Sequence, residues 1–174
     1  MADSWPEPVE RVAAFLRQAG AEARIEELEL DAASAADAAR ATGATPDAIV
    51  KSILVICDGR PVLALLPGDR RADTAKIAAA CGTRTARLAR ADEVVASTGF
   101  APGGVAPFPL AHVETVLVDR TLLAQELVWV GAGSPSHLAA LRPTELLRLT
   151  QARPVDAVEE PVALTAQPAL RGDA

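Results

Sequence analysis

Apolar residues at helical spacing open the chain, and shorter apolar runs follow between turn-forming residues. Val9, Val12 and Leu16 lie three to four positions apart, a pattern that predicts a helix over 8–19. The same kind of reasoning, with caps and turn residues marking the ends, predicts the remaining elements. We expect helices over 34–42, 73–80, 91–97 and 143–149, a single helical turn from 45, and strands over 23–30, 50–57, 61–66, 83–88, 113–118 and 127–131.

The strongest strand signal is a pair of β-rich runs, 50–57 and 61–66, with Asp58 and Gly59 between them. An Asp-Gly pair between two such runs is typical of a β-hairpin. Helices and strands alternate elsewhere, but neighbouring antiparallel strands argue against a doubly wound parallel sheet. The pattern therefore predicts an α+β fold with a mixed sheet.

The periodic pattern of apolar residues ends near Gln151. From there the chain contains Pro154, Pro161 and Pro168 and shows no periodic apolar face. We therefore expect one domain over 1–150 and a flexible C-terminal tail over 151–174, whose removal leaves stability nearly unchanged.

Composition narrows the class of protein. The chain has 174 residues, of which 50% are hydrophobic, and this length suits one domain with a sizeable core. No apolar run approaches the roughly 18 residues that span a bilayer, and the N-terminus has no export signal. Two cysteines, Cys57 and Cys81, cannot form a disulfide framework. These features predict a cytoplasmic protein with no membrane partner.

Charge is distributed unevenly along the chain. The net charge is −6, yet residues 70–90 carry six basic residues against one aspartate. An acidic protein is a poor general binder of nucleic acid, so we expect no DNA partner. The local basic stretch suits a phosphate-bearing ligand or one end of an RNA, and the alternative is a solvated face. The candidate RNA-facing residues are Arg70, Arg71, Arg84, Arg87 and Arg90.

Several common chemistries lack their sequence patterns. The two histidines and two cysteines have no metal-ligand spacing, so we expect no metal site. Gly131 and Gly133 begin a dinucleotide fingerprint that then fails at Ser136, and we expect no cofactor. Ser134 and Ser136 beside His137 could suggest a nucleophile and its base, but residues this close in a turn rarely face each other.

Lys51 is the most informative single residue. It is one of only two lysines and interrupts an apolar strand over 48–56. A charge in such a strand either faces solvent on the alternate side or is held in a lined site, because burying it unpaired is costly. Its compact ammonium group has three donors and is suited to holding a phosphate or a developing negative charge.

Two glycine-rich segments are further candidates. In the loop over 99–109, Gly103 and Gly104 allow the main chain to approach a ligand closely, and prolines stiffen the rest. An ordinary surface loop is the alternative. In the segment 130–137 a strand gives way to a glycine turn that carries His137, although a lone histidine is commonly structural.

Three segments in order resemble a known family. They read Val-Lys-Ser-Ile-Leu-Val at 50–55, Ser-Thr-Gly-Phe at 97–100 with Pro-Gly-Gly-Val-Ala-Pro at 102–107, and Val-Trp-Val-Gly-Ala-Gly at 128–133. Together they resemble the YbaK/prolyl-tRNA-synthetase-associated domain family of trans-editing deacylases, over about residues 8–150. The resemblance implies a single compact α+β domain with a mixed, partly barrel-like sheet flanked by helices.

The resemblance also implies roles for individual residues. Lys51 matches the family's lysine, the G-x-x-x-P loop that begins at Gly103 lies against the aminoacyl group, and His137 resembles a histidine of the inserted and alanine-type members. These three are the implied catalytic residues. The implied substrate-binding residues are Ser52, Gly104, Pro107, Gly131 and Gly133. The family uses no metal and no covalent nucleophile, so positioned water, backbone amides and the substrate's ribose hydroxyl are implied to perform the reaction.

The activity implied by the resemblance is hydrolysis of the ester that joins a wrong, small amino acid such as Ala, Cys, Ser or Thr to the CCA end of a tRNA. Proline tRNA is the usual substrate, and prolyl-tRNA synthetase is a further candidate partner. Two alternatives stay open. One is a non-catalytic module that binds aminoacyl-tRNA or a nucleotide for regulation, and the other is a hydrolase of small aminoacyl esters unrelated to tRNA.

Overall fold

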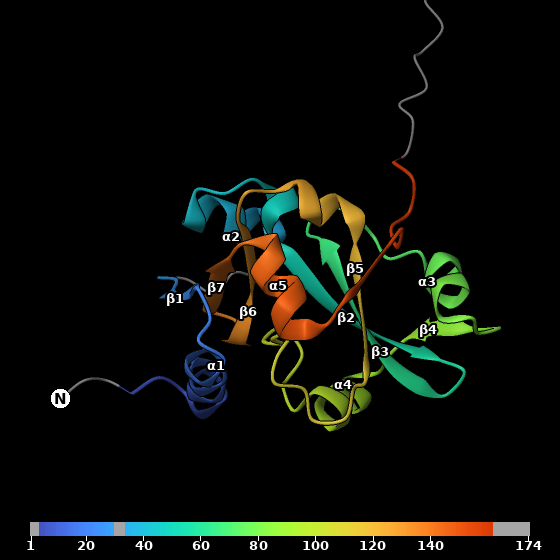
Figure 1. Cartoon of the computed structure of the whole chain (residues 1–174), viewed down its shortest axis with the longest axis horizontal. Helices are drawn as coiled ribbons and strands as arrows, with labels where there is room; N and C mark the ends of the chain where they lie inside the picture. The colour runs from blue at the N-terminus through green and yellow to red at the C-terminus, as the bar shows by residue number, and fades with distance from the viewer. Residues whose placement is uncertain (1–3, 30–33, 162–174) are drawn as a thin grey trace, which may run out of the picture.

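Two β-sheets and five α-helices make up the computed structural model, which describes residues 4–29 and 34–161 (Figure 1). In chain order the helices are α1 (Glu7–Gln18), α2 (Ala35–Thr42), α3 (Thr74–Cys81), α4 (Ala91–Thr98) and α5 (Pro143–Thr150), with short 3-10 turns at Pro46–Ala48 and Arg120–Ala124. The strands are β1 (Ala23–Glu27), β2 (Val50–Cys57), β3 (Arg60–Pro67), β4 (Ala86–Leu88), β5 (Thr115–Asp119), β6 (Val128–Ser134), β7 (His137–Leu141) and β8 (Arg153–Val155).

The larger sheet has five strands in the order β4-β2-β3-β5-β8. The predicted hairpin is confirmed: β2 and β3 pair antiparallel, and both Asp58 and Gly59 have the positive φ angles that a tight hairpin turn needs. β5 then pairs parallel with β3, and β8 pairs parallel with β5. The sheet is therefore mixed, as the sequence predicts.

The smaller sheet has three antiparallel strands in the order β1-β7-β6. An isolated parallel bridge between Ile49 and Trp129 joins it to the larger sheet, and over the described residues the strands do not close into a barrel. Figure 1 shows the two sheets side by side, with α1 below the smaller one and α3 beside the larger one. The predicted mixed α+β class is confirmed, and its sheet is open.

The two faces of β2 belong to different parts of the core. Val50 and Leu54 point into the main cluster, which includes residues of β3, β5, β6 and β7. Val55 and Cys57 point the other way, into a smaller cluster with Ile77 of α3. Because side chains alternate along a strand, Lys51 lies on the same face as Val55 and Cys57. The lysine therefore sits at the end of the face that α3 covers.

The predicted tail is wrong for residues 152–161. β8 extends the larger sheet, and the side chains of Val155 and Val158 are buried in the cluster with α3. A buried carboxylate, that of Asp119, accepts a 2.9 Å hydrogen bond from the backbone N–H of Ala157. The short strand is held by backbone pairing and by isolated apolar side chains, which leave no periodic face in the sequence. Residues 162–174 of the predicted tail lie outside the described residues.

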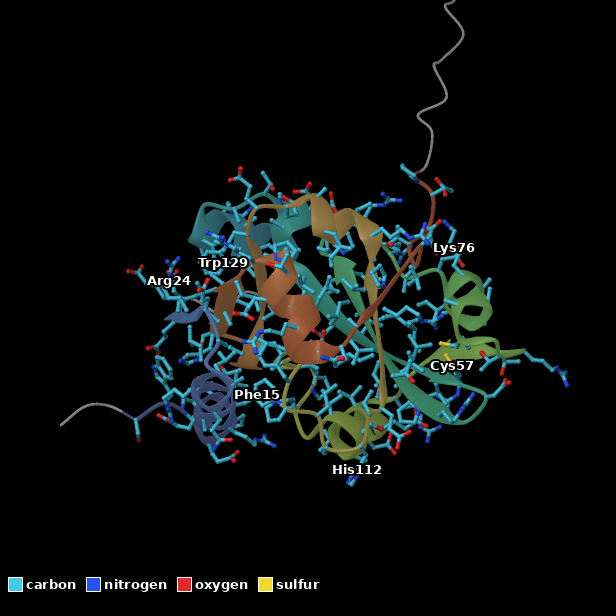
Figure 2. All side chains as sticks on the ribbon, viewed as in Figure 1. Phe15, Arg24, Cys57, Lys76, His112 and Trp129 are labelled. Atoms are coloured by element: carbon cyan, nitrogen blue, oxygen red, sulfur yellow. The ribbon has the colours of Figure 1, made fainter. Side chains whose placement is uncertain are left out.

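Lys76, on α3, binds the same segment. Its ammonium group donates to the carboxylates of Asp156 and Glu160, each at 3.0 Å, and to the carbonyl of Val158 at 2.8 Å. In Figure 2, Lys76 lies beside this part of the chain. These contacts raise the pKa of Lys76, mainly through the hydrogen bonds to the two carboxylates. We call residues 152–161 the C-terminal strap.

Two strands differ from their predicted form. The predicted strand over 127–131 continues to Ser134 with an irregular register after Gly131, although the glycines suggested a turn there. β7 is absent from the prediction because its sequence, His-Leu-Ala-Ala-Leu, is poor in β-branched residues. No helix in the described ranges has the length and apolar character needed to cross a bilayer.

Candidate functional site

A cavity of about 280 Å³ opens beside the first residues of β2. β4 pairs with β2 only over Val55–Cys57, so the edge of β2 before that point faces this cavity. The opposite walls come from the loop after α4, from β6 and from the start of α2. Four predicted site residues line the cavity: Lys51, Ser52, Gly103 and Gly131. The structure therefore brings together segments that lie about 80 residues apart in sequence.

Lys51 is half-buried and lies at the wall of this cavity. Its Nζ donates a 3.1 Å hydrogen bond to the backbone carbonyl of Arg70. The ammonium group joins no ion pair in the described part of the chain, which leaves two N–H donors for a ligand. The lysine is thus fixed by the main chain at one donor and available at the others, and it is not an ordinary solvated strand lysine.

Ser52 points to the other face of β2, as alternation requires. Its Oγ is buried and has no hydrogen-bond partner among the described residues. Buried hydroxyl groups are rarely left unpaired, because each missing hydrogen bond costs about 1–3 kcal/mol. The Ser52 hydroxyl is therefore available to a ligand or to water in the cavity.

The loop after α4 approaches β6 closely through its main chain at two glycines. A Cβ at Gly131 would lie 2.3 Å from the carbonyl oxygen of Val105, so only glycine fits there. A Cβ at Gly104 would lie 3.0 Å from the carbonyl oxygen of Gly133 and from Cα of Ser134. Gly104 thus brings the loop against β6 behind the cavity wall, whereas Gly133 lies against the main chain at Pro8, where a Cβ would be 2.7 Å from the carbonyl oxygen. Pro107 is buried and anchors the other end of the loop.

His137 lies behind this wall and does not line the cavity. It is 2% exposed, and Trp5 packs on its ring edge to face, with ring centroids 5.8 Å apart. Its Nδ1 lies 2.5 Å from the Oγ of Ser134, which does line the cavity. The expectation that these two residues do not face each other is wrong, because β6 and β7 form a hairpin in which Ser134 and His137 are cross-strand partners.

The five candidate RNA-facing arginines have three kinds of surroundings. Arg87 and Arg90 flank Glu93, and the hydrogen bond from the Arg87 guanidinium, with that from the backbone N–H of Arg90, lowers the pKa of Glu93 to about 2. Arg70 donates to the carbonyl of Glu159 in the C-terminal strap. Arg71 and Arg84 are exposed and take part in none of the ion pairs found over the described ranges.

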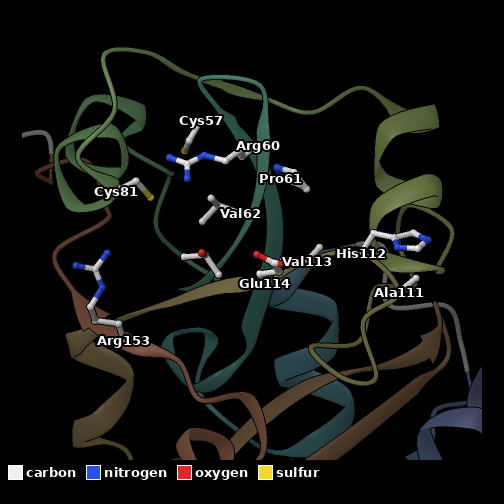
Figure 3. A pocket seen from close by; sticks show the side chains of 11 residues that line it. Cys57, Arg60, Pro61, Val62, Cys81, Ala111, His112, Val113, Glu114 and Arg153 are labelled. Carbon is white, nitrogen blue, oxygen red and sulfur yellow. The ribbon is translucent and has the colours of Figure 1, made fainter.

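A larger cavity, of about 530 Å³, lies at the opposite end of the β2–β3 hairpin (Figure 3). It is lined by Cys57 and Cys81 and by the guanidinium groups of Arg60 and Arg153, which come from the hairpin and from β8. Burial, together with the neighbouring Cys81 thiol, raises the pKa of Cys57 to about 11, so this thiol is not a nucleophile at neutral pH. None of the predicted site residues lines this cavity.

Comparison with known proteins gives matches over much of the chain. The profile of the aminoacyl-tRNA editing domain family matches residues 29–149. The uncharacterized protein YwhH of Bacillus subtilis is 32% identical over 123 residues, which is 70% of this chain and 78% of that protein. A proline–tRNA ligase of Lactobacillus gasseri is 36% identical over 89 residues, which is 51% of this chain and only 16% of the ligase.

A solved structure shares the fold over nearly the whole chain. It is described as a candidate trans-editing enzyme for prolyl tRNA synthetase, and it superposes with a TM-score of 0.85 and 34% sequence identity. The alignment covers 90% of this chain and 100% of that one. The residues matched by the family profile, 29–149, include the strands and loops that form the cavity around Lys51.

Proposed function

The chain belongs to the aminoacyl-tRNA editing domain family, and on this premise we propose that it hydrolyses mischarged aminoacyl-tRNA in trans. The proposed substrate class is proline tRNA that carries a small wrong amino acid such as Ala, Cys, Ser or Thr. Prolyl-tRNA synthetase is the proposed partner, and the cytoplasm is the proposed location. The reaction is the hydrolysis of an ester, without a metal or another cofactor.

The observation that carries the proposal is the placement of Lys51. Its ammonium group faces a small cavity with two donors free and one held by the Arg70 carbonyl. A phosphate or ribose oxygen of the terminal nucleotide could accept those donors, which would hold the ester against the main chain of the Gly103 loop. The cavity has a volume of about 280 Å³, just below the roughly 300 Å³ at which the range for ligand pockets begins, and this favours a small aminoacyl group.

The test is a deacylation assay on a matched panel. Proline tRNA charged with Ala, Cys, Ser or Thr is compared with two correctly charged tRNAs: proline tRNA carrying proline and alanine tRNA carrying alanine. We expect fast hydrolysis of at least one mischarged proline tRNA and little hydrolysis of Pro-tRNA. Binding without turnover on the whole panel would favour the non-catalytic regulatory module. Equal hydrolysis of a free aminoacyl ester would favour an esterase unrelated to tRNA.

Gly131 should be sensitive to the smallest substitution. In Gly131→Ala the new Cβ would meet the Val105 carbonyl at 2.3 Å, so the loop must move. Overpacking of this kind costs about 1–3 kcal/mol of stability, and a displaced loop should slow deacylation roughly tenfold. Thermal unfolding and single-turnover deacylation measure the two effects.

Gly59→Ala is the control for that substitution. It strains the hairpin turn at φ +81 but meets no neighbouring atom within 4 Å, and it lies far from the cavity. We expect it to lower stability and to leave the deacylation rate of the folded protein unchanged. Equal rates for the Gly131 and Gly59 variants would show that the loop contact does not shape the site.

Arg71 and Arg84 are the arginines to neutralise in a test of RNA binding, because both are exposed and outside the ion pairs described above. The double variant Arg71→Ala, Arg84→Ala should weaken tRNA binding and reduce the log–log salt slope by roughly two. The matched control is Arg17→Ala with Arg142→Ala, which removes the same charge from exposed positions away from the cavity. If both double variants bind equally, the basic stretch is only a solvated face.

A further inference from the structure

Ser134 occupies a position at the cavity wall for which the sequence predicted no role. It ends β6, and its Cα lies where the Gly104 main chain approaches most closely. Its hydroxyl has three polar neighbours in the β6–β7 turn. The backbone N–H of Ser136 donates to Oγ at 3.2 Å, the Oγ of Ser136 lies 3.3 Å away, and Nδ1 of His137 lies 2.5 Å away. Ser134 lines the cavity, whereas His137 and Ser136 do not.

These contacts determine what the hydroxyl can offer a ligand. A serine oxygen has one hydrogen and two lone pairs. The Ser136 N–H occupies one lone pair, and in the tautomer with its proton on Nε2, His137 accepts the hydroxyl hydrogen at Nδ1. The hydroxyl of the half-buried Ser136, 3.3 Å from Ser134 Oγ, donates to solvent in this arrangement. One lone pair then remains for the cavity. In this arrangement Ser134 presents a fixed hydrogen-bond acceptor, and His137, buried under Trp5, fixes its orientation from behind.

The charges around the cavity indicate which part of a substrate needs that acceptor. An aminoacyl ester carries an α-ammonium group, which must find acceptors and avoid Lys51. Among the described residues that line the cavity, Lys51 is the sole charged side chain and no carboxylate is present. The remaining lining side chains are apolar or are the hydroxyls of Ser34, Ser52 and Ser134. The acceptor that the main chain and His137 together orient is that of Ser134.

We propose that Ser134 Oγ accepts a hydrogen bond from the α-ammonium group of the substrate's amino acid, with His137 acting as its positioning residue. This inference rests on the proposed function. It makes Ser134 a specificity-determining residue that distinguishes an aminoacyl ester from an ester whose nitrogen is blocked or replaced. It also gives His137 an effect on selectivity without contact with the substrate.

The test compares two substrates that differ only at the nitrogen. Proline tRNA charged with alanine is compared with proline tRNA charged with N-acetylalanine, and kcat/KM is measured for each. A hydrogen bond to a charged group contributes enough for roughly a tenfold to hundredfold preference, so we expect the wild-type protein to prefer the free amine by that factor. Ser134→Ala should lose most of this preference by slowing the alanyl substrate. Ser134→Thr, which keeps the hydroxyl, should retain part of it.

Three further variants complete the test. Ser136→Ala keeps the backbone N–H that Ser134 accepts and removes the Ser136 hydroxyl, whose oxygen lies 3.3 Å from Ser134 Oγ and 3.4 Å from Nδ1 of His137. We expect it to retain the preference, because the acceptor lone pair of Ser134 stays available. His137→Ala should lose part of the preference, and the double variant with Ser134→Ala should lose no more than Ser134→Ala alone. The inference is overturned if the wild-type protein deacylates alanyl-tRNA and Ser134→Ala keeps the same preference for the free amine. The proposed function would still stand in that case. A wild-type protein inactive on all mischarged substrates would overturn the proposed function itself.

Discussion

Lys51→Ala should lower the rate of deacylation by at least about 100-fold while the protein stays folded. The ammonium group is the only charged group that lines the described cavity, and its loss leaves the ester without an anchor. Misplacement of a reacting group by about 1 Å can cost on the order of 100-fold, and an absent electrostatic contact adds to that. Stability should change little, because the side chain is half-buried and makes a single hydrogen bond to Arg70. Single-turnover deacylation and thermal unfolding measure the two quantities.

Lys51→Arg sharpens the same test. Arginine keeps the charge, but its planar fork does not reproduce a compact ammonium group between the Arg70 carbonyl and the cavity. We expect poor rescue. Arg142→Ala, which removes one positive charge from an exposed position outside the cavity, is the control for net charge. A folded Lys51→Ala protein with a near wild-type rate would contradict the proposed mechanism.

Deletion of the chain from Gln151 onward should destabilise the domain by about 3–6 kcal/mol. The deletion exposes the partners of Val155 and Val158, and burial of each such side chain contributes roughly 1.5–3 kcal/mol. It also removes β8 and leaves the Asp119 carboxylate without the Ala157 N–H. A loss of this size is a large part of the 5–15 kcal/mol that holds a typical domain together. Denaturant unfolding measures it.

A chain that ends at Pro161 is the matched control for that deletion, since it retains every contact of the C-terminal strap described above. The longer deletion should also slow deacylation at temperatures where the protein remains folded. The reason is that the strap holds the loop that carries the Arg70 carbonyl: the backbone N–H of Glu159 donates to Arg71 O at 2.9 Å. Equal unfolding midpoints for the two truncated chains would show that the strap adds no stability.

The sequence predicted local features well and long-range contacts poorly. The Asp58–Gly59 hairpin was predictable because two residues determine a tight turn, and Lys51 was visible as a charge within an apolar run. The strap was missed because three residues of β8 are too few to show a period. The contact between Ser134 and His137 was missed because it depends on the hairpin between β6 and β7. Glycine and serine residues are equally common in turns that join no paired strands, so the sequence does not reveal this hairpin.

The role of Gly131 shows the same limit at the site. Its glycine-rich surroundings suggested close approach to a ligand, whereas the structure shows close approach to the main chain at Val105. Sequence indicates that a Cβ is absent at this position, but not which atom occupies the space. Similarly, the +5 charge of residues 70–90 was visible, but its partial neutralisation by Glu93 depends on the packing of α4 beside β4.

The pairing of β1 with β7 has a consequence for the order in which a new chain folds during translation. The β2–β3 hairpin, with Lys51 on it, is complete once residue 67 has left the ribosome. The sheet that carries Ser134 and His137 cannot close until Leu141 is available to pair with Ala23, and contacts this distant in sequence form late. A chain released by a stalled ribosome before Leu141 therefore contains the lysine but lacks the β1–β7 pairing beside the cavity.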